Sequence, residues 1–337
     1  MTVREELERR EHKHLNPLAA FADQTAGRPN GDRARENDVR TCYQRDTDKI
    51  VHSKAFRRLM HKTQVFLNPE GDHYRTRLTH TLEVTRIART ITRALGLNED
   101  LAEAIAMGHD LGHTPFGHAG EAALDALMPG GFQHNEQSLR VVDYLENNGR
   151  GLNLTYEVRM GIVGHTGAQI PETLEGQVVR HSDRIAYINH DIDDAIRAGI
   201  LTTEDIPRDI IELLGDAHSK RIDTIVCDMI VTSREAGEIL LSPKVDQALK
   251  DLRAFMFERV YRNPIAKGEE GKAKMMLTKL FEYYVNHPEE LPADFQPQLS
   301  FDGLERIVCD YIAGMTDNYA VDKYSEIFIP MGWHVRG

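Results

Sequence analysis

The sequence predicts an all-α protein that forms one domain of many helices. Apolar residues recur at spacings of three and four along most of the chain, which places them on one face of a helix. No stretch of strict apolar–polar alternation is long enough for a sizeable sheet. The 337 residues, 41% of them hydrophobic, suffice for a substantial core.

The first clear helix is expected at residues 78–95, where leucine, isoleucine and alanine side chains share one face. Gly96 should end it, because glycine readily adopts the backbone conformation found after helices. Asn98 should cap the next helix, with Glu99 and Asp100 in its first turn, where the helix dipole favours negative charge.

That next helix, LAEAIAMG, is apolar nearly all round and should therefore be buried. It places His109 and Asp110 at its C-terminal end. The Thr114-Pro115 pair then breaks the chain, and a short helix is expected from about His118 to the stop at residues 129–131.

The rest of the chain is also expected to be helical, and residues 68–76, NPEGDHYRT, could hold a small β-hairpin. The remaining helical segments are EVRMGIVGH, EGQVVRHSDRIAYINHDIDDAIRAG, RIDTIVCDMIVTS, VDQALKDLRAFMFERVY, KAKMMLTKLFEYYVN and LERIVCDYIAGMTDNYAVDKYSEIF. No linker separates two domains. Residues 1–45 are polar and charged, which indicates an N-terminal arm or a segment that contacts a partner.

Composition excludes several classes of protein. The net charge of −12 argues against a general nucleic-acid binder, so single-stranded DNA is a partner that the charge does not support. No stretch approaches the ~20 apolar residues of a membrane span, and the N-terminus has no signal-peptide core. Cys42, Cys227 and Cys309 are odd in number and far apart, which indicates reduced thiols in a cytoplasmic protein.

Basic residues gather in one region of this acidic chain, immediately before a histidine-rich segment. Two interpretations stay open: a phosphate-binding surface or an ordinary solvated helix face. The residues are Lys54, Arg57, Arg58, Lys62, Arg75 and Arg77.

The histidine-rich segment HDLGHTPFGHAGE places five side chains that bind metals or move protons within thirteen positions. They are His109, Asp110, His113, His118 and Glu121. Neither a packed core nor a solvated surface favours this composition, so the segment is a candidate site.

A metal site needs ligands from more than one segment. His109 and Asp110 are adjacent, His80 lies on the preceding long helix, and Asp183 is the natural candidate for a fourth ligand. Two imidazoles and two carboxylates suit Mn, Mg, Fe, Co, Ni or Zn and are not a thiolate-type structural zinc centre. Four protein ligands leave an octahedral ion open to water and substrate.

Asp183, Tyr187 and Asp191 are spaced four apart and therefore project from one face of a helix. Tyr187 as an ordinary core aromatic and Asp191 as a solvated carboxylate form the alternative interpretation. Because Tyr187 and Asp191 share a helix face with Asp183, a candidate metal ligand, a role in the site is favoured.

His118 and Glu121 are neighbours on one helix face, because they are three residues apart. A carboxylate that hydrogen-bonds an imidazole raises its basicity, so the pair is a candidate proton donor or relay. His134, in FQHNEQS, is a further polar group expected nearby. A capping histidine with a first-turn glutamate, and packing for His134, would explain the same residues.

With these motifs in order, the chain resembles the HD superfamily of metal-dependent phosphohydrolases. The sequence around these motifs, from about residue 40 to 325, resembles the deoxynucleoside triphosphate (dNTP) triphosphohydrolases of this superfamily, the dGTPase-like branch. The matching segments are RDTDKIVHSKAFRRLMHKTQVF, RLTHTLEV, HDLGHTPFGHAGE, FQHNEQS, SDRIAYINHDIDDA and DYIAGMTDNYA.

The resemblance implies hydrolysis of a dNTP at the α-phosphorus to a deoxynucleoside and intact tripolyphosphate. It implies metal binding by His80, His109, Asp110 and Asp183. His118, with Glu121 behind it and His134 nearby, would protonate the leaving 5′-oxygen or position the attacking water. Residues 46–200 would form the phosphohydrolase core, and 201–337 a C-terminal helical part of the same domain.

The resemblance also implies a set of residues that contact the substrate. His113, Arg77 and Arg184 would contact phosphate, and Tyr187 and Asp191 the sugar-phosphate and the 3′-hydroxyl edge. Gln64 would lie near the deoxyribose and help to exclude a 2′-hydroxyl.

Two other functions stay open at this point. The first is another HD-type phosphohydrolase, such as a nucleotidase or an alarmone hydrolase, and the second is a nucleotide-sensing or single-strand-DNA-binding assembly. The sequence leaves the preferred base, the metal and a dNTP activator undecided. Relatives form tetramers or hexamers, so the resemblance implies a homo-oligomer.

Overall fold

The computed structural model describes residues 1–337 except 33, 36, 65–74, 262–268, 297–301 and 331–337. The described residues form helices and connecting loops and no strand, which confirms the all-α prediction. Most of the hairpin expected at residues 68–76 lies outside the described residues. A single antiparallel bridge pairs Thr63 with Thr76.

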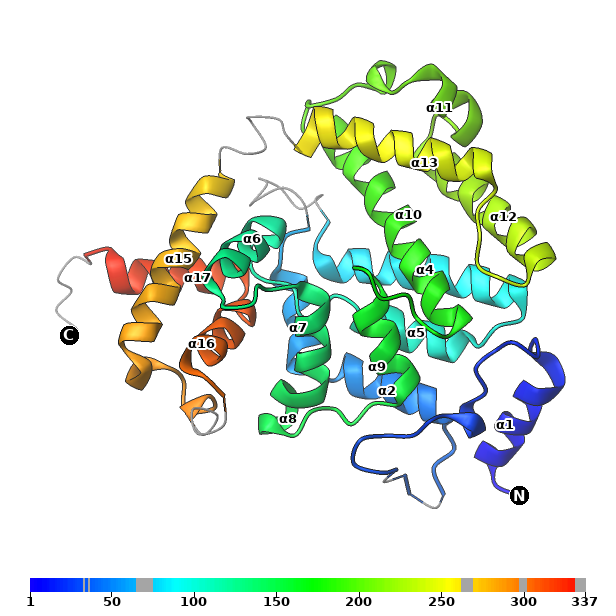
Figure 1. The fold of residues 1–337 in the computed structure, drawn as a ribbon, viewed down its shortest axis with the longest axis horizontal. Helices are drawn as coiled ribbons and strands as arrows, with labels where there is room; N and C mark the ends of the chain where they lie inside the picture. The colour runs from blue at the N-terminus through cyan, green and yellow to red at the C-terminus, as the bar shows by residue number, and fades with distance from the viewer. Residues whose placement is uncertain (33, 36, 65–74, 262–268, 297–301, 331–337) are drawn as a thin grey trace, which may run out of the picture.

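The helices follow one another in the order shown in Figure 1. They are α1 (Val3–His14), α2 (Cys42–Val51), α3 (Lys54–Arg58), α4 (Arg77–Leu95), α5 (Glu99–Gly108), α6 (Gly117–Leu127), α7 (His134–Arg140), α8 (Glu146–Gly149), α9 (Tyr156–Gly164), α10 (Leu174–Arg197), α11 (Arg208–Leu214), α12 (His218–Ala236), α13 (Pro243–Met256), α15 (Glu270–Asn286), α16 (Leu304–Ala313) and α17 (Asp317–Phe328).

Helix α5 lies at the centre of the larger core. It packs against α2, α4, α9 and α10, and its Leu101 and Ile105 are completely buried. Burial of such side chains stabilises the fold by about 1.5–3 kcal/mol each. Asn98 caps α5 as predicted, since its side chain accepts hydrogen bonds from the backbone N–H groups of Asp100 and Leu101. The end of this enclosed helix therefore delivers His109 and Asp110 to the protein interior.

A second apolar cluster joins α6 to α15, α16 and α17, on the left of Figure 1. Leu124 of α6, Leu277 and Leu280 of α15 and Ile312 of α16 are fully buried there. Helix α6 thus connects the histidine-rich segment to the C-terminal helices.

Residues 304–328, expected as one helix, form two. Gly314 follows the last turn of α16, and Thr316 caps α17 because its side chain accepts a hydrogen bond from the Tyr319 N–H. The apolar spacing continues across this break, which is why the sequence pattern concealed it.

The break places Asp317 where its carboxylate can reach the turn before α6. The Asp317 carboxylate accepts hydrogen bonds from the backbone N–H groups of Thr63 and Phe116, both at 2.9 Å. Phe116 has a left-handed backbone with φ of 61°, which is uncommon for a bulky residue. The C-terminal helices therefore fix the turn that precedes His118.

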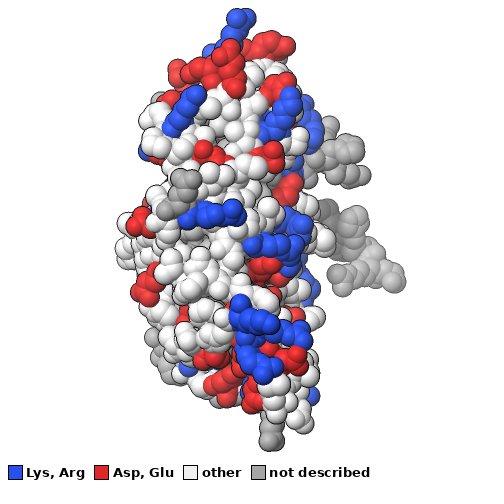
Figure 2. All heavy atoms as spheres, turned by 90° about the vertical axis from the view of Figure 1, so that its right-hand side faces the viewer, with Lys and Arg blue, Asp and Glu red and all other residues white. Residues whose placement is uncertain are grey.

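The N-terminal segment contacts the body of the protein. Ala19 and Ala22 are buried, and the Ala20 N–H donates to Glu175 of α10 at 3.0 Å. All three cysteines are free thiols. Within the described part of the chain, every helix is too short or too polar to span a bilayer. On the face shown in Figure 2, basic and acidic side chains are intermingled, with no continuous field of one sign.

Candidate active site

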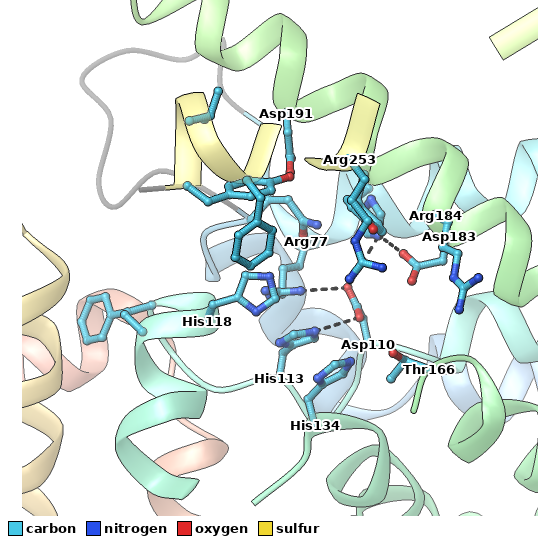
Figure 3. A pocket seen from close by; sticks show the side chains of 18 of the residues that line it. Arg77, Asp110, His113, His118, His134, Thr166, Asp183, Arg184, Asp191 and Arg253 are labelled. Carbon is cyan, nitrogen blue, oxygen red and sulfur yellow. Dashed lines mark hydrogen bonds and ion pairs between the residues drawn. The ribbon is translucent and has the colours of Figure 1, made fainter. Parts of the chain in front are cut away.

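A cavity of about 500 Å³ is lined by residues of α4, α6, α7, α10, α13 and α15. This volume lies within the range of about 300–1,000 Å³ that is typical of small-molecule sites. Every site residue predicted from the sequence lines the cavity except His109 and Glu121, which contact residues of its wall. Figure 3 shows Asp110 at the floor, between Arg77 and His113.

The four predicted metal ligands converge at the floor of this cavity. His80 Nε2 lies 3.0 Å from Asp183 Oδ1 and 4.0 Å from Asp110 Oδ2. His109 Nε2 lies 3.3 Å from Asp110 Oδ1 and 3.9 Å from Asp183 Oδ1. Two imidazoles and two carboxylates from three segments therefore lie together, and ligand atoms of His80, His109 and Asp110 all lie within 4.8 Å of one another, close enough to hold one ion.

The orientation of His109 fits a metal ligand. Its Nδ1 lies 2.7 Å from the Ala106 carbonyl oxygen, an acceptor, so the ring proton is on Nδ1. Its Nε2 is fully buried and has no hydrogen-bond partner among the described residues. A buried polar atom without a partner is costly, and a cation at this point would satisfy it.

Both carboxylates at the floor are ionised. Burial raises the pKa of Asp183, but the hydrogen bond with His80 and the nearby His109 hold it well below its usual range. Asp110 is similar: burial opposes ionisation, and His109, His113 and Arg77 lower its pKa. The donor chemistry and these charges fit a divalent cation.

The six basic residues between Lys54 and Arg77, the first residue of α4, do not form one binding surface. Arg77 is buried, lines the cavity and donates to Asp110 at 3.0 Å. Lys62 is buried and donates to the carbonyl groups of His113 and Ala313, and Arg75 pairs with acidic residues of α4 and α10. The phosphate-binding interpretation therefore applies to Arg77 alone among the six, because only Arg77 lines the cavity.

Glu121 has His134 as its nearest partner. Its Oε1 lies 2.8 Å from His134 Nδ1, whereas Oε2 lies 3.7 Å from His118 Nδ1. Burial raises the pKa of Glu121, but these two histidines keep it far below its usual range. The His118 side chain is 81% exposed and lines the cavity, so its ring is accessible to a bound ligand.

His113 and His134 form a stack on the cavity wall, with ring centroids 3.9 Å apart. His113 Nε2 lies 3.2 Å from Asp110 Oδ1, and its buried Nδ1 has no protein partner. Burial lowers the pKa of His113 well below its usual value, so the ring is neutral. Because a neutral imidazole that donates from Nε2 to an ionised carboxylate has no second proton, the free Nδ1 can accept one hydrogen bond from a ligand.

His165 is a site residue that the sequence analysis missed. It lines the cavity, and its Nε2 lies 3.2 Å from His134 Nε2. Like His109, it follows a glycine at the end of a helix and bonds a carbonyl three residues earlier, here Ile162 at 2.7 Å. The repeated Gly-His ending of LAEAIAMGH and EVRMGIVGH was the available signal.

The opposite wall is formed by α10 and by the segment from α13 to Tyr261. Tyr187 and Asp191 line it with Arg184, and the Tyr261 hydroxyl donates to Asp191 Oδ2. Burial raises the pKa of Asp191 to about 7. Further lining residues that the sequence analysis did not single out are Thr166, Arg253, Phe257, Glu270 and Lys274.

Gly112 lies in close contact with the backbone of α7, and a substitution there tests how tightly the two segments pack. A Cβ at this position would lie 2.1 Å from the Ser138 backbone nitrogen and 2.5 Å from the His134 carbonyl oxygen. We expect Gly112→Ala to lower the free energy of unfolding by about 3 kcal/mol or more, the upper end for overpacking. Urea denaturation measures this. Gly271→Ala is the control, because its Cβ would meet no atom within 4 Å, and equal stability of the two variants would contradict the expectation.

An all-α fold with two histidines and two aspartates at a cavity floor fits a metal-dependent hydrolase. The HD domain model matches residues 77–188, and the phosphohydrolase-associated domain model matches residues 239–326. Two relatives share the name deoxyguanosinetriphosphate triphosphohydrolase-like protein. That of Caldanaerobacter subterraneus is 58% identical over 99% of this chain and 98% of its own length. That of Clostridium perfringens is 50% identical over 98% of each chain.

The chain belongs to this deoxyguanosinetriphosphate triphosphohydrolase-like family of HD-domain hydrolases. A solved structure of a hypothetical protein from Aquifex aeolicus is 19% identical and covers 84% of this chain and 71% of its own, with a TM-score of 0.48. That likeness is too slight to add to the fold described above.

Proposed function

We propose that this chain hydrolyses deoxynucleoside triphosphates to a deoxynucleoside and intact tripolyphosphate, with the help of one divalent cation. The observation on which the proposal rests is the convergence of His80, His109, Asp110 and Asp183, with the free Nε2 of His109 facing the two carboxylates. The relatives' name, which includes dGTP triphosphohydrolase, supports a triphosphate substrate.

The mixed nitrogen and oxygen donors suit Mn, Mg, Fe, Co, Ni or Zn. His80 and His109 would bind the ion through Nε2, and Asp110 and Asp183 would bind it through carboxylate oxygens. A bound ion supplies Lewis-acid polarisation of a phosphoryl oxygen and lowers the pKa of a coordinated water.

Cationic side chains on the cavity wall would neutralise the polyphosphate. A nucleoside triphosphate brings about four negative charges, and positioning with charge stabilisation supplies most of the catalysis in phosphoryl transfer. Arg184, Arg253 and Lys274 line the cavity, and Arg77 lies at its floor with one bond to Asp110. His113, which lies beside Asp110, would lie close to an inner phosphate.

His118 would complete the reaction at the leaving group. Water attacks the α-phosphorus, the bond from phosphorus to the 5′-oxygen breaks, and the 5′-oxygen takes a proton from His118. Glu121 lies near His118 and hydrogen-bonds His134, so it would orient the His118 ring and stabilise its protonated form.

Gln64 would contribute to the choice of sugar. Gln64 is 8% exposed at the cavity wall, and its Oε1 has no hydrogen-bond partner among the described residues. We expect Gln64→Ala to lower the ratio of kcat/KM for dNTPs over ribonucleotides at least about tenfold, because the smaller side chain would leave room for a 2′-hydroxyl that the wild-type pocket would exclude or bury without a partner, at a cost of about 1–3 kcal/mol. Gln247→Ala, at an exposed position on α13, is the control, and an unchanged ratio in Gln64→Ala would remove Gln64 from sugar selection.

The direct test is a panel of all eight dNTPs and ribonucleotides, alone and in mixtures, with Mg and with Mn. Phosphorus NMR of the first product distinguishes the candidates, since the proposal requires tripolyphosphate. Release of orthophosphate or pyrophosphate as the first product would assign the chain to another HD-type reaction. Faster turnover in mixtures would identify a dNTP activator.

A further inference from the structure

A pair of residues behind His80, the buried His190 and the partly exposed Glu83, connects the two helices that meet at the cavity floor. Helix α4 supplies His80 and, one turn later, Glu83, and helix α10 supplies Asp183 and, two turns later, His190. Each helix thus presents one histidine and one carboxylate to the other. His80 and His190 are both 1% exposed.

Close contacts between side chains run without a gap from the cavity floor to Glu83. His80 Nε2 lies 3.0 Å from Asp183 Oδ1, and His80 Nδ1 lies 3.5 Å from His190 Nδ1. The other nitrogen of His190, Nε2, lies 2.7 Å from Glu83 Oε2. The ring planes of His80 and His190 are perpendicular, with centroids 5.6 Å apart.

Donor and acceptor rules allow one arrangement of protons along this chain. A histidine that binds a cation through Nε2 has its proton on Nδ1, so His80 must donate from Nδ1. The facing Nδ1 of His190 must then accept, which puts the His190 proton on Nε2. That proton faces the Glu83 carboxylate, a group that can only accept when it is ionised.

We propose that Glu83 and His190 are positioning residues that fix the tautomer and the ring orientation of His80 for metal binding. The inference rests on the proposed ligand role of His80. His109 achieves the same result with a backbone carbonyl, the Ala106 oxygen. Partners of this kind tune metal ligands, and their replacement typically weakens metal affinity or activity about 10–100-fold.

The variant Glu83→Gln tests which nitrogens of His190 and His80 carry protons. Glutamine removes the carboxylate charge that holds the His190 proton on Nε2, and its NH₂ group can take the place of either oxygen, because Arg75 Nε lies at similar distances from both, 3.3 Å from Oε2 and 3.4 Å from Oε1. With the NH₂ group toward His190, His190 would accept at Nε2 and carry its proton on Nδ1, where it faces the His80 proton. His80 must move its proton to Nε2 and lose the lone pair that the cation needs. The Glu83 side chain is 37% exposed, so this replacement is compatible with folding.

The experiment is calorimetric titration of metal-free full-length protein with Mn²⁺, supported by ¹⁵N NMR of the histidine rings, which reports each tautomer without metal. We expect Glu83→Gln and His190→Leu to weaken Mn²⁺ binding about 10–100-fold and to change the His80 tautomer. His190→Gln should recover part of the affinity, because its amide can accept from His80 and donate to Glu83. His218→Asn is the control, since His218 stacks on His190, with centroids 5.7 Å apart, outside the series of contacts from Asp183 to Glu83.

Two results would overturn the proposals separately. Wild-type Mn²⁺ affinity in both Glu83→Gln and His190→Leu, with binding lost in His80→Ala, would refute the positioning role alone. Wild-type affinity in His80→Ala would instead refute the ligand role of His80 on which the inference depends. If His190→Leu does not fold, Glu83→Gln decides the question.

Discussion

Replacement of Asp183 with alanine is expected to abolish bound metal and turnover together. The carboxylate lies 3.0 Å from His80 Nε2 and 3.9 Å from His109 Nε2, and its loss removes a negative charge from a buried site that must neutralise a divalent cation. Metal content after gel filtration, measured by mass spectrometry, and tripolyphosphate release from dGTP are the two measurements.

The matched control for this variant is Asp322→Ala, because Asp322 is an exposed aspartate of α17 away from the cavity lining. It should keep both metal and turnover. Retention of metal at wild-type stoichiometry in Asp183→Ala would refute the ligand role of Asp183. Loss of turnover alone would then point to substrate contact instead.

Replacement of His118 with alanine is expected to separate chemistry from binding. His118 is exposed to the cavity and makes no close contact with the four metal-site residues, so metal and nucleotide affinity should stay near wild type. We expect kcat to fall on the order of 10²–10⁴-fold, the usual effect of losing a general acid or base. Single-turnover kinetics with saturating dNTP and Mn²⁺ measures this.

His14→Ala, at an exposed position in α1, serves as the control for removal of a surface imidazole. An unchanged kcat in His118→Ala would leave His118 as a residue of the α6 terminus without a role in the reaction.

The parts of the fold that depend on local signals were predictable from the sequence. The C-terminal end of α4 follows from Gly96 and the start of α5 from Asn98, because each of these residues acts within one helical turn. Helix α11 was not predicted, because seven residues are too few for a periodic pattern to stand out. The break between α16 and α17 was hidden because apolar spacing continues through Gly314.

The candidate site was predictable only where its residues belong to recognisable motifs. His165 and Tyr261 were missed because their partners, His134 and Asp191, are 31 and 70 residues away in sequence and are brought near by packing alone. For the basic residues between Lys54 and Arg77, the sequence suggested a shared surface that the structure does not form. Lys62 looked like a surface charge, but it is buried and bonds two backbone carbonyls.

The contact of Asp317 with Thr63 and Phe116 limits how this enzyme can be divided. Residues 77–188, the part that the HD domain model matches, contain the whole candidate metal site but neither Thr63 nor Asp317. An excised fragment of that length would lose the restraint on the strained Phe116 turn and would expose the apolar face of α6. We therefore expect the minimal folded unit to extend through α17, and we expect insertions or fusions that separate α17 from the turn to destabilise the protein.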